Sequence, residues 1–184
     1  NHVKRIKELA NSGKYDNVVF HRVIDGFMAQ TGDVKFGNSE SKDFDLRRAG
    51  MGGSDFPDLK QEFNSLPHDR GTLSMARSSD PNSANSQFFI CFKPAPFLDR
   101  QYTVFGKVIE GMEYVDKIKR GDENNNGAVT DPDSANSQFF ICFQPAPFLD
   151  RQYTVFGKVI EGMEFVDKIK RGDQNNNGAV TDPD

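Results

Sequence analysis

The chain has 184 residues and a formal net charge of −4 at pH 7, which fits one domain of ordinary size. This charge gives no electrostatic support for binding a nucleic acid or an anionic membrane. The longest uninterrupted apolar run, at residues 88–92, is far shorter than the roughly 20 residues that a membrane-spanning helix requires. We therefore expect a soluble protein with no nucleic-acid partner and no membrane partner.

The first residues predict an amphipathic helix of about ten residues. Val3, Ile6, Leu9 and Ala10 recur at helical spacing, and Gly13 follows where a helix end favours a residue that tolerates positive φ. The chain has no initiating Met, so we expect that its natural start is missing and that any signal peptide is lost with it. We expect a cytoplasmic protein, with the periplasm as the alternative.

Short apolar runs between turn residues predict strands. Residues 17–24 are β-branched and aromatic, and residues 27–30 follow them after an Asp-Gly turn signal, which together predict a hairpin. Residues 34–65 are rich in Gly, Ser and Asp and predict a long ordered surface loop. Three more strands are predicted at residues 71–76, 86–92 and 103–109. Short strands between turns favour a barrel or a sandwich.

A second helix is predicted at residues 111–121. Val115 and Ile118 mark its inward stripe, and Gly121 is expected to end it. The following residues 122–127, DENNNG, resemble the front of a calcium loop. Its twelfth position is Asp133 instead of a bidentate Glu, and a proline interrupts the exit helix, so we favour a Gly-terminated turn.

The most unusual feature of the chain is a direct repeat. Residues 80–130 match residues 131–181 at every position except four: Asn82/Asp133, Lys93/Gln144, Tyr114/Phe165 and Glu123/Gln174. Two near-identical copies do not fit a solenoid, which needs three or more units. The copies meet at a shared Asp-Pro, which indicates recombination or a joining of related fragments. We expect a truncated domain at 1–130, and at 131–184 a partial duplicate of 80–133 that is not an independent domain.

Two cysteines occur, Cys91 and Cys142, and they are one position seen in both copies. Each lies in an apolar run, where free thiols usually act as small buried hydrophobes. No disulfide framework is implied.

Four sequence words carry a resemblance to a known family. They are FHRVIDGFMAQTGD at 20–33, GTLSMAR at 71–77, SQFFI at 86–90 and FLDRQYTVFGKVIEGM at 97–112. In this order and spacing the chain resembles the cyclophilins, the prolyl isomerase family, of the compact bacterial kind. The resemblance covers essentially all of residues 1–130.

The resemblance implies a mainly β fold, a closed eight-stranded antiparallel barrel capped by two helices. It also implies two strands before the first helix and one after the second, for which this chain has no residues. We therefore expect an incomplete barrel, together with a duplicated strand-strand-helix segment. Missing strands would leave unpaired edges, so we also expect low stability.

The chemistry of an X-Pro bond indicates what such a site requires. Rotation about the amide is opposed by about 18 to 20 kcal/mol. A catalyst needs a donor near the prolyl nitrogen, whose lone pair localises as the bond twists, and a dry pocket for the ring. The resemblance assigns the donor to Arg22, because a guanidinium stays protonated and presents several fixed N–H groups. An ordinary surface ion pair is the alternative. The implied reaction is peptidyl-prolyl cis-trans isomerisation without a covalent step or a cofactor.

The resemblance also implies the residues that contact the substrate. Gln30 and Gln87 match polar groups that hold the substrate carbonyl and backbone, with Gln30 counted beside Arg22 in catalysis. Ala76 and Arg77 match the strand edge along which the peptide lies, where the family often has Asn in place of Arg77. The pocket for the proline ring is matched by Phe27, Met28, Phe89, Phe97, Leu98 and Tyr102, for which core packing is the alternative.

Two departures bear on partners. Many eukaryotic members have Trp where this chain has Phe97 and His where it has Tyr102. An aromatic wall and a polar tip remain, so we expect proline turnover to survive. The expected partners are proline-containing peptides and unfolded or folding proteins, with cyclosporin bound weakly because the indole donor is absent.

Other constellations carry less weight. Ser74, His21 and Asp33 suggest a hydrolytic set, but no nucleophile elbow or base-orienter spacing supports it. His2, His21 and His68 show no metal-ligand spacing, so structural or surface roles are favoured and no metal is implied.

Three functions remain open. The leading hypothesis is an isomerase that assists protein folding. The second is a module that grips proline peptides without turnover, against which the intact Arg22 argues, and the third is a non-functional truncated or joined fragment. We expect one site, for which the two copies compete. The second copy carries Gln138, Phe140, Phe148, Leu149 and Tyr153, but no counterpart of Arg22, Phe27, Met28 or Gln30.

Overall fold

The structure, a computed structural model, describes residues 1–131. The second copy of the repeat therefore lies outside the described residues, and so do the predictions made for it. In chain order the elements are α1 (His2–Asn11), β1 (Arg22–Ile24), β2 (Met28–Thr31), β3 (Thr72–Met75), β4 (Phe88–Cys91), η1 (Pro96–Leu98), β5 (Val104–Lys107), α2 (Met112–Val115) and η2 (Glu123–Asn125). The predicted mainly β class with two helices is confirmed.

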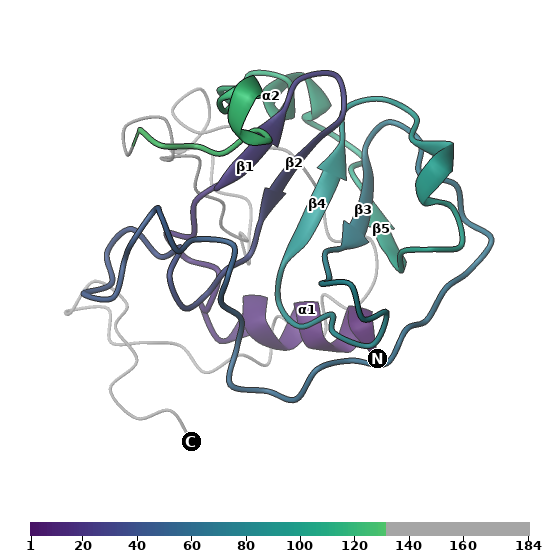
Figure 1. Cartoon of the computed structure of the whole chain (residues 1–184). Helices are drawn as coiled ribbons and strands as arrows, with labels where there is room; N and C mark the ends of the chain where they lie inside the picture. The colour runs from purple at the N-terminus through teal and green to yellow at the C-terminus, as the bar shows by residue number, and fades with distance from the viewer. Residues whose placement is uncertain (132–184) are drawn as a thin grey trace, which may run out of the picture.

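The five strands form one antiparallel sheet in the order β1-β2-β4-β3-β5. Figure 1 shows α1 crossing one end of this sheet and α2 lying at the opposite end. The predicted hairpin is confirmed, with Gly26 at φ 67° in its turn. Within residues 1–131 the sheet stays open, with β1 and β5 at its two edges. The closed barrel that the resemblance implied is not formed by these residues.

The register of the sheet aligns the residues that matter most. Arg22 on β1 lies opposite Gln30 on β2, Gln30 opposite Phe89 on β4, and Phe89 opposite Ser74 on β3. Directly opposed residues project from the same face of a sheet. The four side chains therefore form one row across four strands.

Each face of the sheet has its own apolar cluster. The main core lies on one face and joins Val23, Ala29 and Ile90 of the strands to Leu9 of α1 and Val115 of α2. The opposite face carries a second cluster, composed of Met28, Phe89, Cys91, Ala95 and Leu98 with Ile24, Phe27, Ala76 and Tyr102 packed against it. All four residues of β4 are buried because both faces of this central strand are covered.

The predicted first helix is confirmed, and Ile6, Leu9 and Ala10 of its expected stripe pack in or against the main core, but two polar residues are buried on the helix as well. His2 and Arg5 are buried while Val3 is 45% exposed. The reason is the segment that α1 packs against: Arg5 donates to the carbonyl of Pro57 at 2.9 Å, and the His2 ring lies 2.9 Å from the carbonyl of Lys60. Backbone carbonyls of a loop require donors, so polar side chains occupy this face.

The second helix is shorter than predicted. It ends at Val115, although Val115 and Ile118 do pack against the main core as expected. Gly121 does not terminate it. A Cβ on Gly121 would clash with the carbonyl oxygen of Gly127. The N–H of Gly121 donates to the carbonyl of Val23 at 2.9 Å. Glycine is needed there because two backbone segments cross at close range beside the edge of β1.

The edge of β1 is covered by the turn that follows α2. Val23 donates to the carbonyl of Gly127 at 2.7 Å, and Val129 donates to the carbonyl of His21 at 2.9 Å. The predicted Gly-terminated turn is confirmed as η2, with Asn126 at φ 53° and Gly127 at φ 74°. This contact brings a segment from the end of the described chain to the beginning of the sheet.

The predicted surface loop at 34–65 is confirmed, and one buried carboxylate organises it. Asp33 has no exposed surface and accepts hydrogen bonds from the backbone N–H groups of Lys35, Phe36, Gly50 and Gly52, at 2.7 to 3.0 Å. Charge-assisted bonds of this kind are among the stronger ones in proteins. The loop thus owes its shape to backbone contacts with a side chain at the end of β2.

Cys91 is buried, as predicted, and burial raises the pKa of its thiol to about 12. The thiol therefore stays protonated and behaves as a small apolar side chain. No helix in residues 1–131 is long and apolar enough to cross a membrane.

Candidate active site

Arg22 projects from β1 and is held by neutral oxygen atoms. Its Nε donates to the backbone oxygen of Asn126 at 3.0 Å, and Nη2 donates to the side-chain oxygen of Asn126 at 2.7 Å. Nη1 donates to Oε1 of Gln30 at 3.3 Å. These bonds leave one N–H on each terminal nitrogen without an acceptor among the described residues. Arg22 makes no ion pair among the described residues, and its role as the catalytic donor stays a prediction.

A relay of amides continues from Arg22 into the loop. Gln30 Nε2 donates to Oε1 of Gln87 at 3.0 Å, and Gln87 Nε2 donates to the carbonyls of Gly50 and Gly52 at 2.9 and 2.6 Å. Both hydrogens of the Gln87 amide are therefore engaged by protein, whereas Gln30 retains one. The role of each amide toward a substrate stays a prediction. In this structure Gln87 fixes the loop against the row of Arg22 and Gln30.

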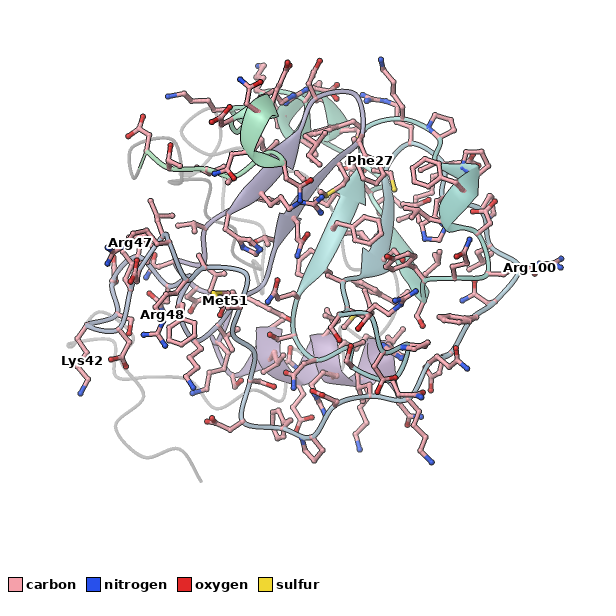
Figure 2. The ribbon with its side chains drawn as sticks, in the orientation of Figure 1. Phe27, Lys42, Arg47, Arg48, Met51 and Arg100 are labelled. Carbon is pink, nitrogen blue, oxygen red and sulfur yellow. The ribbon has the colours of Figure 1, made fainter. Side chains whose placement is uncertain are left out.

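The predicted pocket residues come together in the second apolar cluster. Met28, Phe89 and Leu98 are buried within it, and Phe27 and Tyr102 pack against it half-buried. Phe27 lies near the upper end of the sheet in Figure 2. Its ring centroid is 5.4 Å from that of Phe97, which is the one wall residue with most of its surface exposed, at 63%. An exposed aromatic ring above a buried apolar floor is typical of a site for an apolar ligand.

The end of β3 forms the other rim. Ala76 packs against the second cluster, and its N–H donates to the carbonyl of Gln87 at 2.9 Å. Next along the chain, the guanidinium of Arg77 lies 4.3 Å from the centroid of the Tyr102 ring. Tyr102 in turn meets Phe89 edge-on at 5.9 Å between centroids. Arg77 therefore contacts the pocket floor through the ring of Tyr102, whereas Ala76 packs against the floor directly.

A polar ladder supports the floor from beneath. His68 is buried, with Nδ1 2.9 Å from Oδ1 of Asp99 and Nε2 2.9 Å from Oγ of Ser74. Its ring stacks on Phe89 at 6.1 Å between centroids. The Ser74 hydroxyl donates to the carbonyl of Thr103 at 3.1 Å. The ladder ties the turn η1 and strand β3 to the back of Phe89.

The suggested hydrolytic set of Ser74, His21 and Asp33 is wrong. Ser74 instead contacts Nε2 of His68, whose Nδ1 lies 2.9 Å from Asp99. Its hydroxyl has no exposed surface and is already donated to a carbonyl, so no substrate can reach it. The arrangement supports the pocket and does not supply a nucleophile.

His21 lies under the loop, beside Asp33 and Gln87. It is buried, and neither ring nitrogen makes a hydrogen bond. Gly50 fits closely against it, since a Cβ there would lie 2.9 Å from the ring. Burial lowers the pKa of His21 to about 4, partly opposed by the charge of Asp33. The ring is therefore neutral at pH 7 and fills space between the sheet and the loop.

Asn126 is the residue that sequence reasoning missed. The DENNNG segment was considered for calcium, and among the described residues no group of acidic, His or Cys side chains is arranged to hold a metal ion. The turn instead supplies the two oxygens that hold Arg22. The usable signal was the Asn-Gly pair, since Asn and Gly tolerate left-handed backbone and mark a tight turn.

Comparison with known proteins places these residues in a family. Residues 1–131, and again residues 123–184, match the family described as cyclophilin type peptidyl-prolyl cis-trans isomerase/CLD. The chain belongs to this family. The predicted cyclophilin family, cyclophilin-like fold class and isomerase assignment are thereby confirmed. The truncation and the duplication remain predictions.

Relatives and solved cyclophilins agree with this assignment. A probable peptidyl-prolyl cis-trans isomerase of Brucella abortus is 63% identical over 132 residues, covering 72% of this chain and 67% of the relative. Peptidyl-prolyl cis-trans isomerase A of Dickeya dadantii is 42% identical, covering 68% of this chain and 63% of that protein. The chain thus spans about two thirds of the length of these cyclophilin relatives.

A solved cyclophilin of Cryptosporidium parvum, crystallised in the presence of the dipeptide Ala-Pro, has a TM-score of 0.56 and 32% identity to this chain. The alignment covers 69% of this chain and 76% of that structure. The Ala-Pro dipeptide belongs to the solved cyclophilin. It shows that a member of the family with a similar fold was studied with a proline peptide.

Proposed function

We propose that this chain catalyses rotation about X-Pro bonds on the face of the sheet between Arg22 and the Phe27–Phe97 pair, where we place the substrate groove. The observation that carries the proposal is the row Arg22–Gln30–Phe89, which sets a fixed guanidinium beside a buried apolar floor. Rotation needs no covalent chemistry, only better binding of the twisted amide than of the planar one. A preorganised donor beside an apolar pocket meets this requirement.

The proposed mechanism uses few groups. The proline ring enters the second apolar cluster between Phe27, Phe89 and Leu98, where water is excluded. As the amide twists, the prolyl nitrogen becomes pyramidal and its lone pair accepts an N–H from Arg22. Gln30 Nε2 retains one free hydrogen that can hold the substrate carbonyl. The guanidinium remains protonated throughout, so no proton is transferred.

The proposed substrates are proline segments of folding or unfolded chains. The exposed ring of Phe97 beside the half-buried Phe27 supports this class of substrate, because it offers an extended peptide an apolar contact. We propose that cyclosporin binds weakly, because Phe97 stands where an indole would supply an N–H donor.

We propose that the second copy, residues 131–184, does not form a second active site. It lies outside the described residues, and its sequence has no counterpart of Arg22 or Gln30. The match of residues 123–184 to the same family supports a partial duplicate. Residues 1–131 are therefore proposed to contain the one complete set of site residues.

The decisive experiment compares Arg22→Ala with the parent chain by NMR exchange spectroscopy on a short Ala-Pro peptide. We expect turnover to fall by about 100-fold or more while peptide affinity changes less, because the donor acts chiefly in the twisted state. Arg47→Ala is the matched control, since Arg47 is 90% exposed and paired with Asp45. Undiminished turnover in Arg22→Ala would remove Arg22 from the mechanism. Binding by the parent without turnover would favour the binding-module hypothesis.

A further inference from the structure

The rim of the groove carries two guanidinium groups that have no carboxylate partner among the described residues. Every acceptor of Arg22 is an amide or carbonyl oxygen. Arg77 likewise donates to carbonyls only: Nη1 to Ser78 at 2.9 Å, and Nη2 to Gln101 at 3.0 Å. Arg47, Arg70 and Arg120 differ, since each pairs with an aspartate, as Arg70 does with Asp116 at 2.6 Å. Arg22 and Arg77 thus place two positive charges without carboxylate partners on this face, on a chain whose net charge is −4.

The position of Arg77 fixes where its charge acts. Its guanidinium lies 4.3 Å from the centroid of Tyr102, and Tyr102 contacts the floor residue Phe89. The carbonyls of Ser78 and Gln101 accept hydrogen bonds that hold the guanidinium on this ring. The positive charge therefore has a defined position. One hydrogen of Nη2 remains without an acceptor in residues 1–131. Asp99, on the neighbouring turn, is engaged by the backbone and ring of His68.

The distance between a charge and the bound peptide decides how strongly that charge acts on the peptide. The Debye length is about 8 Å at physiological ionic strength, so the net negative charge spread over the chain is largely screened at the groove. A carboxylate on a bound peptide within a few ångströms of Arg77 is screened much less. The local positive charge therefore dominates recognition once the peptide is seated.

We infer that Arg77 selects proline segments that carry an acidic side chain within two residues of the proline. This inference rests on the proposed function and specifies its substrate class. Exposed pairs of this kind are modest, so the expected preference for Glu over Gln is about two- to fivefold. The planar guanidinium also allows a bidentate contact with a carboxylate, which an ammonium cannot make.

The test uses proline peptides in matched pairs, with Glu or Gln at each of the two positions on either side of the proline. The ratio of kcat/KM for Glu over Gln is measured by exchange spectroscopy, and the same ratio is read from affinity by chemical-shift titration. We expect a ratio of about two to five at one or more positions. It should fall towards one in 1 M NaCl, where the Debye length is about 3 Å.

Three variants test whether Arg77 causes the preference for Glu over Gln. Arg77→Gln should bring the Glu/Gln ratio to about one, Arg77→Lys should restore part of it, and Arg47→Gln should leave it intact. Figure 2 shows Arg47 on the surface loop, away from Phe27. A ratio of one at every position in the parent chain, or a ratio that survives Arg77→Gln, would overturn the inference. Failure of the Gln peptides to turn over would instead contradict the proposed function, and the affinity ratio would still decide the role of Arg77.

Discussion

Asn126 holds Arg22 through two hydrogen bonds, one accepted by its backbone oxygen and one by its side-chain oxygen, although 104 residues separate them. Asn126 has φ 53°, a left-handed conformation that Asn and Gly adopt more readily than other residues. The same residue therefore shapes the turn and orients the guanidinium.

The first prediction concerns this contact. Asn126→Gly keeps the left-handed turn but removes the 2.7 Å bond to Nη2, so Arg22 gains freedom. We expect kcat to fall about three- to tenfold with KM little changed, because orientation matters most in the twisted state. Asn177→Gly, at the equivalent position of the second copy, is the matched control. Equal kcat values for the two variants would show that the side chain of Asn126 does not position Arg22.

The second prediction concerns pH and His21. Its pKa is lowered to about 4, so between pH 6.5 and 4 the unfolded chain binds a proton that the folded chain does not. The stability is present above pH 6.5 and is lost as pH falls, by about 3 kcal/mol in all. His21→Leu should flatten the pH dependence of the unfolding free energy over this window, measured by urea denaturation. An unchanged slope in the variant would assign the pH dependence to other groups.

The third prediction concerns Asp99. Hydrogen bonds from the backbone and ring of His68 lower the pKa of Asp99. A carboxylate with a lowered pKa stabilises the fold above its unfolded value of about 3.9, and this contribution is lost as pH falls through the folded pKa. Asp99→Asn should therefore lower the melting temperature at pH 7 and match the parent chain more closely near pH 2. A constant difference between the two chains across this range would contradict the role given to the carboxylate.

The fourth prediction concerns the second copy. If both copies can occupy one place in the sheet, the longer connection to residues 131–184 costs about 1.5 kcal/mol, which corresponds to roughly tenfold preference for the first copy. A chain with Gln87→Ala and Phe89→Ala should then retain about a tenth of its turnover. Adding Gln138→Ala and Phe140→Ala should abolish the remainder. Complete loss from the first pair alone would mean that the second copy does not substitute for the first.

Local sequence patterns predicted most of the sheet. The hairpin, the three later strands and the long loop each follow from β-branched runs and turn residues. The pocket walls were assigned by resemblance, and the strand register explains why Arg22, Gln30 and Phe89 meet. The predicted length of α2 was wrong because the apolar spacing continues past the helix end at Val115, where Ile118 still packs against the main core from a turn.

Contacts between segments far apart in the chain could not be predicted from the sequence. The burial of His2 and Arg5 depends on carbonyls more than fifty residues away, and a hydrophobic stripe cannot reveal them. The partner of Ser74 was misjudged for the same reason, since His68 and Asp99 come from separate turns. Sequence shows which residues have polar groups, whereas only the fold shows which of those groups satisfy one another.

Asp33 accepts hydrogen bonds from four backbone N–H groups of the loop, so the loop can keep its path when an exposed side chain on it is replaced. Backbone N–H groups of Gly50 and Gly52 donate to Asp33, and Met51 between them is 78% exposed, so the side chain of Met51 is under little structural constraint. Figure 2 shows Met51 on this loop at the side of the sheet. Substitutions there can alter the surface offered to a passing chain while the frame stays intact. The side chain at position 51 can therefore change without altering the path of the loop, provided that Asp33 is kept.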